Sequence, residues 1–281
     1  METTLFGKLP LAKALEVTSS LGLKEMEIGL SHFDACRSGQ KEYKKLREQL
    51  SEHGLKLGAL FALAGFDPMT WSKFSLGFSS PKESDRESGV TQMKNAISLI
   101  GELDCRLMVS ELTGDRKNYQ GSLDSFKKSM EQIIPRLESS DVTICFEAHP
   151  GDFIEDSFEA TKLLRSLGSK HVKYNYCIPH TFVLRHSSDA ILDDAKDLVG
   201  YIHMADTLDP QRIFFCPTYS PEVVPHLHST PGEGDIDFGA VISKLKTIGF
   251  DGILSICNFS HMDLPDEAAS KAVSRVHEML K

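Results

Sequence analysis

The sequence lacks the features of a nucleotide-binding or nucleic-acid-binding protein. No GxGxxG motif follows the first apolar run, which disfavours a doubly wound dinucleotide-binding sheet. The formal net charge is −9, and lysine and arginine form no run of the length needed for a basic stripe. We therefore expect no nucleic-acid partner.

Cysteine and long apolar runs are also scarce. Six cysteines in 281 residues are too few for a disulfide scaffold. The first segment, METTLFGKLPLAKALEV, has an acidic second residue and no apolar run long enough for a signal peptide or a membrane span. These absences predict a cytoplasmic protein without a membrane partner, in which each reduced cysteine either fills the core or binds a metal.

Short apolar runs alternate with amphipathic stretches along the chain. Helices are predicted from Pro10 to Gly22 and from Asp237, as N-cap, to Gly249. About eight strand–helix repeats indicate a single α/β domain over 1–281, a (β/α)8 TIM barrel. The predicted strands are 24–30, 55–63, 105–111, 142–147, 172–177, 201–205 and 252–257, with a degraded first strand around TTLFG at 3–7.

Two connections are longer than a barrel needs, 64–88 after the third strand and 206–234 after the seventh. Both are expected on the C-terminal face, where barrel enzymes keep their chemistry. The first holds the only tryptophan, Trp71, a candidate substrate contact. The sequence leaves open whether this aromatic loop is a lid or a contact in a homo-oligomer.

Four strands in succession end with residues that bind metals, namely Glu147, Cys177, His203 and Cys257. Alone, each has a plainer interpretation: a salt-bridged glutamate, a core-filling cysteine or a hydrogen-bonded histidine. Strand ends of a barrel converge on one axis, however, and one carboxylate, one imidazole and two thiols suffice for a tetrahedral metal site. Their joint occurrence favours such a site.

Five segments, FEAHPGDF, YNYCIPH, YIHMAD, PGEGDIDF and GILSICNF, resemble in order and spacing the xylose-isomerase-like barrel superfamily. That group includes sugar isomerases and epimerases, dehydratases, and the endonuclease IV nucleases. The resemblance implies a divalent metal held by Glu, Asp, His and Glu at the ends of strands five to eight. The first Glu and the His fall on Glu147 and His203, and a substrate-contacting His falls on His180. The Asp and the last Glu fall on Cys177 and Cys257, where this chain departs from the pattern.

The two cysteines leave two interpretations open. In one, the site is retained and its thiolates favour zinc or iron over manganese or magnesium. In the other, the metal is lost, and Glu147 and His203 bind a ligand without chemistry. The second gives a catalytically silent barrel that binds a small polar ligand or a partner.

If the chain is an enzyme, the resemblance implies an isomerase, epimerase or dehydratase that abstracts a proton from a small sugar, polyol or cyclic acid. Glu147 is the candidate base, with His180, His149 or His228 as acid partner. Arg212 is either a contact for a substrate carboxylate or phosphate, or a solvated loop residue. Without a carboxylate at 257 a two-base epimerase is disfavoured, and the charge and missing Asp disfavour a nuclease.

Overall fold

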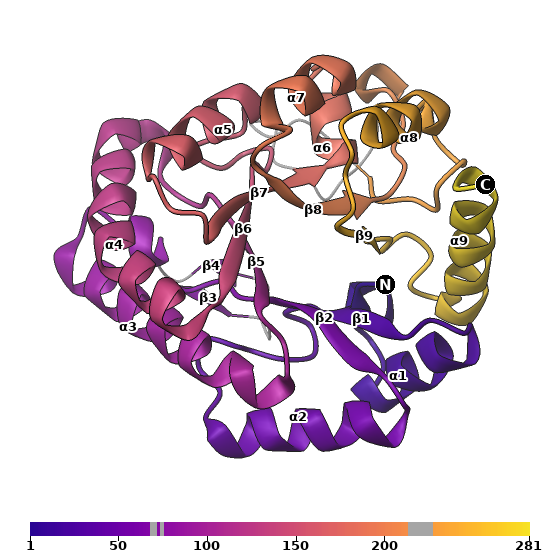
Figure 1. The fold of residues 1–281 in the computed structure, drawn as a ribbon, viewed down its shortest axis with the longest axis horizontal. Coiled ribbons are helices and arrows are strands. Elements are labelled where there is room, and N and C mark those ends of the chain that lie inside the picture. The colour runs from indigo at the N-terminus through magenta and orange to yellow at the C-terminus, as the bar shows by residue number, and fades with distance from the viewer. Residues whose placement is uncertain (68–71, 74–75, 213–226) are drawn as a thin grey trace.

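A parallel sheet curled into a barrel forms the centre of the computed structural model, which describes residues 1–67, 72–73, 76–212 and 227–281. Helices surround the sheet on the outside (Figure 1). Within the described residues the sheet has seven strands in the order β1-β2-β5-β6-β7-β8-β9, each paired in parallel with the next. This confirms the predicted α/β barrel. The strands are β1 (Glu25–Ile28), β2 (Lys56–Phe61), β5 (Leu107–Glu111), β6 (Thr143–Glu147), β7 (Val172–Cys177), β8 (Val199–Met204) and β9 (Ile253–Ile256).

The barrel closes between β9 and β1 through the first two residues of the chain. The Glu2 N–H donates to the Ile256 carbonyl, and the Glu27 N–H donates to the Met1 carbonyl, both at 2.9 Å. The first strand is therefore reduced to one bridging residue, Glu2. The strand predicted at 3–7 is wrong in place: Thr3–Phe6 forms a 3₁₀ helix, because the Glu2 carboxylate accepts the Thr4 N–H at 2.9 Å and caps the turn.

The outer helices begin and end where the sequence predicts in the two cases with clear signals. One helix starts directly after Pro10 and stops before Gly22, whose φ of 78° suits glycine. In another, Asp237 accepts the Ala240 N–H and caps the first turn. The helices are α1 (Leu11–Ser20), α2 (Gln40–Glu52), α3 (Glu83–Leu99), α4 (Tyr119–Ser140), α5 (Ser157–Ser166), α6 (Ile178–Val183), α7 (Ser188–Ala195), α8 (Phe238–Thr247) and α9 (Pro265–Met279).

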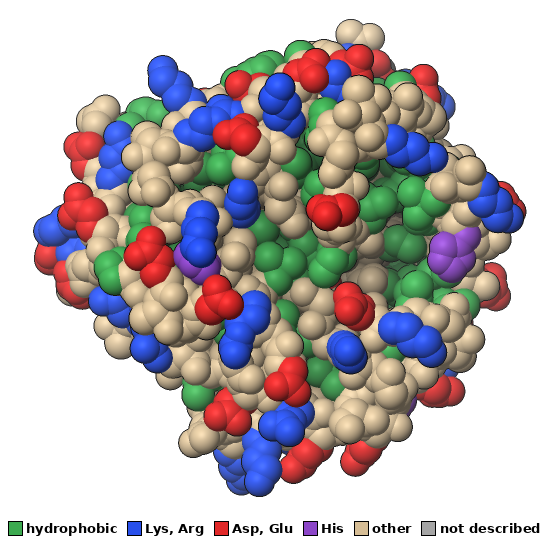
Figure 2. Space-filling model, in the orientation of Figure 1, with side chains coloured by type: hydrophobic (Ala, Val, Ile, Leu, Met, Phe, Trp, Pro, Cys, Tyr) green, Lys and Arg blue, Asp and Glu red, His purple; other side chains and the backbone are tan. Residues whose placement is uncertain are grey.

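Apolar packing separates into two layers. The large layer fills the space between the sheet and the helices. A small layer inside the barrel consists of Ala59, Val109, Cys145 and Tyr201. On the face shown in Figure 2, acidic and basic side chains are mixed over the outer helices, and apolar side chains gather toward the middle. Because strand residues alternate between the two layers, every second residue near the strand ends points into the barrel mouth.

The two long connections follow β2 and β8. A short antiparallel pair, β3 (Phe66–Asp67) and β4 (Ser72–Lys73), lies in the first. Residues 68–71, 74–75 and 213–226 are outside the described part of the chain, so the prediction for Trp71 falls there. Among the helices described, none combines the length and apolar character needed to cross a bilayer.

Candidate active site

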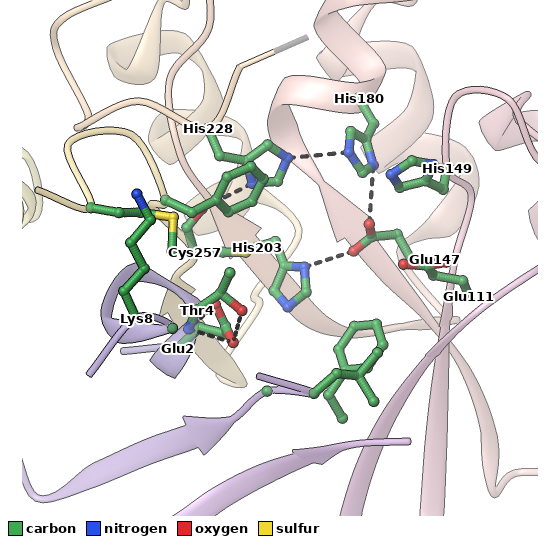
Figure 3. A pocket seen from close by; sticks show the side chains of 16 residues that line it. Glu2, Thr4, Lys8, Glu111, Glu147, His149, His180, His203, His228 and Cys257 are labelled. Atoms are coloured by element: carbon green, nitrogen blue, oxygen red, sulfur yellow. Dashed lines mark hydrogen bonds and ion pairs between the residues drawn. The ribbon is translucent and has the colours of Figure 1, made fainter. Parts of the chain in front are cut away.

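A cavity of about 500 Å³ opens at the C-terminal ends of the strands (Figure 3). Its wall includes acidic, imidazole and thiol groups together with the aromatic rings of Phe61 and Phe259. A cavity of this size with a few converging polar groups has the properties of a small-molecule site. The polar lining residues are Glu2, Thr4, Lys8, Glu111, Glu147, His149, His180, His203, His228 and Cys257.

Glu147, at the end of β6, lies at the centre of the polar wall. Its Oε2 is 2.6 Å from His203 Nδ1, and its Oε1 is 3.0 Å from His180 Nδ1. Asn175 Nδ2 also donates to Oε2 at 2.6 Å. Burial opposes ionisation of this carboxyl, but His203 and His180 outweigh it and hold the pKa of Glu147 well below its usual value.

His203, at the end of β8, lies between two buried carboxylates. Its Nδ1 faces Glu147, and its Nε2 is 3.1 Å from Oε1 of Glu27, a β1 residue. Burial lowers the pKa of His203, but the Glu27 and Glu147 carboxylates raise it well above the usual value. In the metal-free site this imidazole therefore carries two protons, one toward each carboxylate.

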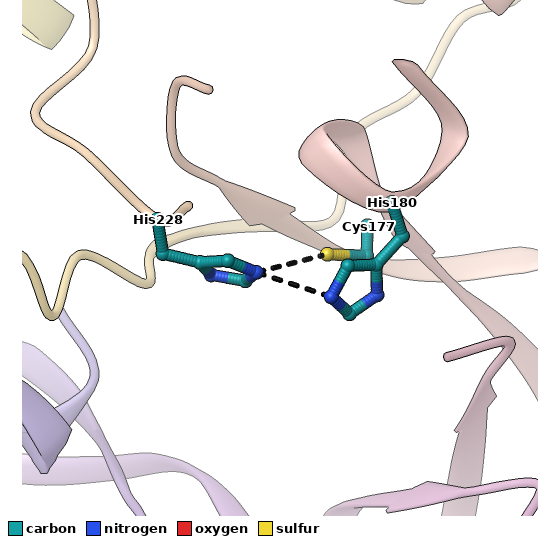
Figure 4. A group of neighbouring side chains, drawn as sticks. All are labelled: Cys177, His180 and His228. Atoms are coloured by element: carbon teal, nitrogen blue, oxygen red, sulfur yellow. Dashed lines mark hydrogen bonds between the residues drawn. The ribbon is translucent and has the colours of Figure 1, made fainter. Parts of the chain in front are cut away.

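A second cluster joins Cys177, the last residue of β7, to two histidines (Figure 4). His180 Nε2 is 3.1 Å from His228 Nε2, and Cys177 Sγ is 3.9 Å from the same His228 nitrogen. His228 Nδ1 donates to the Cys257 carbonyl at 2.9 Å, which leaves its Nε2 as an acceptor in the neutral ring. His180 then donates from both nitrogens, to Glu147 and to His228.

The charges of this cluster follow from these contacts. Burial lowers the pKa of His180, but Cys177 and Glu147 raise it to about 10. Burial and Glu147 oppose ionisation of Cys177, and His180 and His228 outweigh them, so the pKa of Cys177 falls well below the usual thiol value. The cluster thus pairs a thiolate with an imidazolium.

Two groups of side chains in the described part of the chain could hold a metal ion, with all donor atoms of a group within 4.8 Å of one another. They are Glu147, Cys177 and His203, and Cys177, His180 and His228. The first group fits a catalytic zinc, which takes three protein ligands and one open position. Its Glu147 oxygen and His203 nitrogen share a proton at 2.6 Å, and a cation between them would replace that proton.

Cys257 lines the cavity but belongs to neither group found in the described residues. Burial raises the pKa of its thiol well above the usual value, and Glu2 and Glu27 add to this effect. Of the four ligands predicted from the sequence, three fall in one donor group, and Cys257 lies outside both groups although it lines the same cavity.

The remaining predicted site residues differ in position. His149 lines the cavity, its Nδ1 is 2.8 Å from the Pro150 carbonyl, and its ring meets the His180 ring edge-on at 4.6 Å. Arg212 has 60% of its side chain exposed, pairs with Asp235, and is not among the lining residues described. The structure thus keeps His149 beside the acid and imidazole groups and holds Arg212 at the surface.

The glycine-rich segment PGEGDIDF serves as a turn around one buried carboxylate. Asp206 accepts the N–H groups of Thr207, Gly232 and Gly234, each at 2.8 Å. A Cβ on Gly234 would lie 2.2 Å from the Thr207 carbonyl oxygen, so only glycine fits. These N–H groups are therefore engaged with Asp206 and do not form a phosphate loop.

Sequence reasoning missed Glu27, Asn175 and Glu2. The first two occupy inward positions of β1 and β7, and a polar residue inside an apolar strand was the available signal. Glu2 was assigned to no strand, because the first strand is a single bridge. Its burial, with Glu27 nearby, raises the pKa of Glu2 to about 7.

Comparison with known proteins agrees with the resemblance noted in the sequence. Residues 15–279 match the family model described as "Xylose isomerase-like TIM barrel", and the chain belongs to this family. A Caenorhabditis elegans protein named "Putative hydroxypyruvate isomerase" is 21% identical over 252 residues, 87% of this chain and 85% of the relative.

Two solved structures share the fold across almost all of both chains. A D-psicose 3-epimerase crystallised in the presence of D-fructose has a TM-score of 0.77 at 15% identity, covering 100% of this chain and 98% of its own. The IOLI protein with a bound zinc atom has a TM-score of 0.73 at 19% identity, covering 100% and 96%. At these identities the likeness establishes the barrel fold.

Proposed function

We propose that the protein is a metal-dependent isomerase or epimerase that moves a proton next to the carbonyl of a small hydroxylated substrate. The observation that carries this proposal is the buried Glu147 carboxylate on the cavity wall, paired with both His180 and His203. The relatives give support at the level of reaction class, since two of them are named as a sugar epimerase and a hydroxypyruvate isomerase.

Glu147, Cys177 and His203 would hold the metal ion. A divalent ion bound there supplies a Lewis acid that polarises the substrate carbonyl and stabilises the negative charge that develops on its oxygen. A thiolate ligand favours zinc or iron over manganese or magnesium. The zinc atom in the IOLI protein of the same fold agrees with that choice.

The protein groups divide the proton transfers between them. Glu147 takes the proton from the carbon beside the carbonyl, and the same oxygen returns it to the neighbouring carbon. His180 holds one proton on Nδ1 toward Glu147 and another on Nε2 toward His228, and a substrate oxygen that displaces one of these partners would receive that proton. The lowered pKa of Glu147 favours its ionised form, which is the form that can accept a proton.

A catalytically silent barrel that binds a polar ligand is the second candidate. The observation in its favour is the mutual pairing of Glu147, His180 and His203, which satisfies these groups without a metal. Cys257, placed apart from the donor groups of the described residues, also removes one predicted ligand.

Metal content and hydrogen exchange distinguish the two candidates. Tag-free protein purified without chelator is analysed for zinc and iron, and then incubated in D₂O with a panel of ketoses, inososes and hydroxypyruvate. The proposal expects about one equivalent of metal and deuterium uptake beside the carbonyl of at least one compound, detected by NMR.

The Glu147→Gln variant should abolish this uptake, whereas Glu131→Gln, at an exposed position of α4, should leave it unchanged. Absence of exchange from every compound after loading with zinc or iron would establish the silent barrel. Equal exchange by Glu147→Gln would remove the assigned base.

A further inference from the structure

We propose that Glu27 is a positioning residue. It fixes the His203 ring so that Nδ1 faces Glu147 and Cys177, and it keeps a proton on Nε2. This inference deepens the proposed function and rests on it for the role of the metal. Among the described residues that line the cavity, Glu27 is hydrogen-bonded to His203 alone, so it would act through that histidine.

Glu27 lies inside the barrel, beside the small apolar layer, with 1% of its surface exposed. Its carboxylate receives three donors from two neighbouring strands. Ser255 Oγ donates at 2.7 Å, Tyr201 OH at 3.0 Å, and His203 Nε2 lies at 3.1 and 3.2 Å from the two oxygens. A buried charge is tolerated only when it is paired and hydrogen-bonded, and this carboxylate satisfies both conditions.

The contacts of Glu27 keep one proton of His203 on Nε2. With three donors directed at it, the carboxylate acts only as an acceptor, so the hydrogen in the contact belongs to Nε2. The other nitrogen, Nδ1, then points to Glu147 Oε2 at 2.6 Å and to Asn175 Nδ2 at 3.2 Å. Once a metal ion replaces the proton shared with Glu147, the lone pair of Nδ1 is directed at the place where the donor atoms of the first metal group converge.

A neutral residue at position 27 would reverse this arrangement. Glu147 would then be the only anion in contact with the imidazole, and the one proton left on His203 would lie on Nδ1 to meet it. A metal ion could bind Nδ1 only after that proton moved to Nε2, where no carboxylate would receive it. Carboxylates that orient a metal-binding histidine typically change metal affinity by 10- to 100-fold, which sets the expected effect.

The test compares Glu27→Gln with Glu25→Gln, the same chemical change two residues earlier on β1 at an exposed position. In metal-free protein labelled with ¹⁵N-histidine at one fixed pH, wild type should show His203 protonated on both Nδ1 and Nε2. Glu27→Gln should lose the Nε2 proton and keep the one on Nδ1, and zinc affinity from chelator competition should fall about 10- to 100-fold. Glu25→Gln should match wild type in both measurements.

Two further variants separate positioning from a general loss of stability. Tyr201→Phe removes one donor to the same carboxylate but leaves its charge and its bond to His203, so the Nε2 proton and the zinc affinity should persist. Glu27→Asp keeps the charge and should recover part of the zinc affinity that Glu27→Gln loses.

The inference is overturned if His203 in Glu27→Gln keeps the wild-type proton position, or if zinc binds that variant as tightly as wild type. It is also overturned if Tyr201→Phe loses as much zinc affinity as Glu27→Gln. If wild type binds no zinc, the proposed function fails, and the histidine spectra of the metal-free proteins still decide the role of Glu27.

Discussion

The two sides of the barrel mouth are built differently. On one side, β6, β7 and β8 end in Glu147, Cys177 and His203, whose donor atoms lie within 4.8 Å of one another. On the other side, β9 ends before Cys257, and the neighbouring strand is reduced to Glu2. Figure 3 shows Glu2 and Cys257 together, with His203 between them and Glu147.

Regular pairing explains the difference. Glu147 pairs with Asn175, and beyond a register shift at Tyr174/Asn175 the ladder continues to the pair Cys177 and His203, which fixes the relative heights of these side chains. On the other side β9 pairs regularly with β8, but in the described residues it is joined to β1 through the hydrogen bonds at Glu2 and Glu27. In the proposed function the first side carries the chemistry, and the second side contributes the proposed support through Glu27 and the lining residues Glu2 and Cys257.

Removing the central carboxylate should have the largest effect. Glu147→Gln takes away the proposed base and one metal donor, so turnover of any substrate found by deuterium exchange should fall by about 10²- to 10⁴-fold. Steady-state kinetics of zinc-loaded protein measures this. A loss below about tenfold would mean that the first side is not the reactive one.

On the second side, Glu2 should produce a pH-dependent change of stability. Burial and the nearby Glu27 raise the pKa of Glu2 from about 4.5 to about 7, so the folded state binds this proton more tightly than the unfolded state. The stability that results is complete below pH 4.5 and is lost as the pH rises toward 7.

Relative to wild type, Glu2→Gln should therefore gain up to about 3 kcal/mol of unfolding free energy between pH 4.5 and pH 7.5. Urea unfolding of the metal-free proteins at several pH values measures it. The exposed Glu48→Gln serves as control and should show a constant difference. A constant difference for Glu2→Gln as well would show that its carboxyl titrates normally.

The two cysteines give the most direct comparison of the sides. Cys177→Ser removes a donor of both possible metal groups and should weaken zinc binding by at least about 100-fold, since loss of a ligand exceeds the effect of an outer contact. Cys257→Ser should change zinc affinity less than about threefold. Equal losses would show that Cys257 moves into the metal site, as the sequence pattern predicted.

The smallest effect is expected away from both sides. Arg212 is 60% exposed and pairs with Asp235, and exposed ion pairs contribute less than about 1 kcal/mol. Arg212→Ala should change the free energy of unfolding by no more than this, as measured by urea denaturation. If Arg212→Ala instead raised the KM markedly for an acidic substrate but not for neutral ones, Arg212 would be the substrate contact predicted as one alternative from the sequence.

The first side could be predicted from the sequence and the second could not. Glu147, Cys177 and His203 each end a recognisable strand, and the convergence of strand ends is a property of the barrel fold. The position of Cys257 depends on contacts with distant segments, namely the hydrogen bond from His228 to the Cys257 carbonyl and the bridge that Glu2 makes beside the last strand. No local sequence pattern encodes such contacts.

Glu27 was missed for a related reason. Its partner His203 lies 176 positions away in the sequence, and the role of a buried glutamate can be inferred only when such distant donors are known. Local sequence patterns show a charged residue in a strand but do not identify its hydrogen-bond partners. The helix ends at Pro10 and Asp237, in contrast, depend on neighbours within four residues, and they were predicted correctly.

The closure of the barrel joins mechanical and chemical integrity in one residue. The Glu27 N–H donates one of the two hydrogen bonds that flank the single-residue bridge, and the Glu27 carboxylate is hydrogen-bonded to His203. Opening the barrel at this bridge would therefore also break the contact between Glu27 and His203. Amide hydrogen exchange at Glu2 and Glu27 should therefore report how often the barrel opens at this bridge. A ligand that slows this exchange would stabilise the closed barrel when it binds.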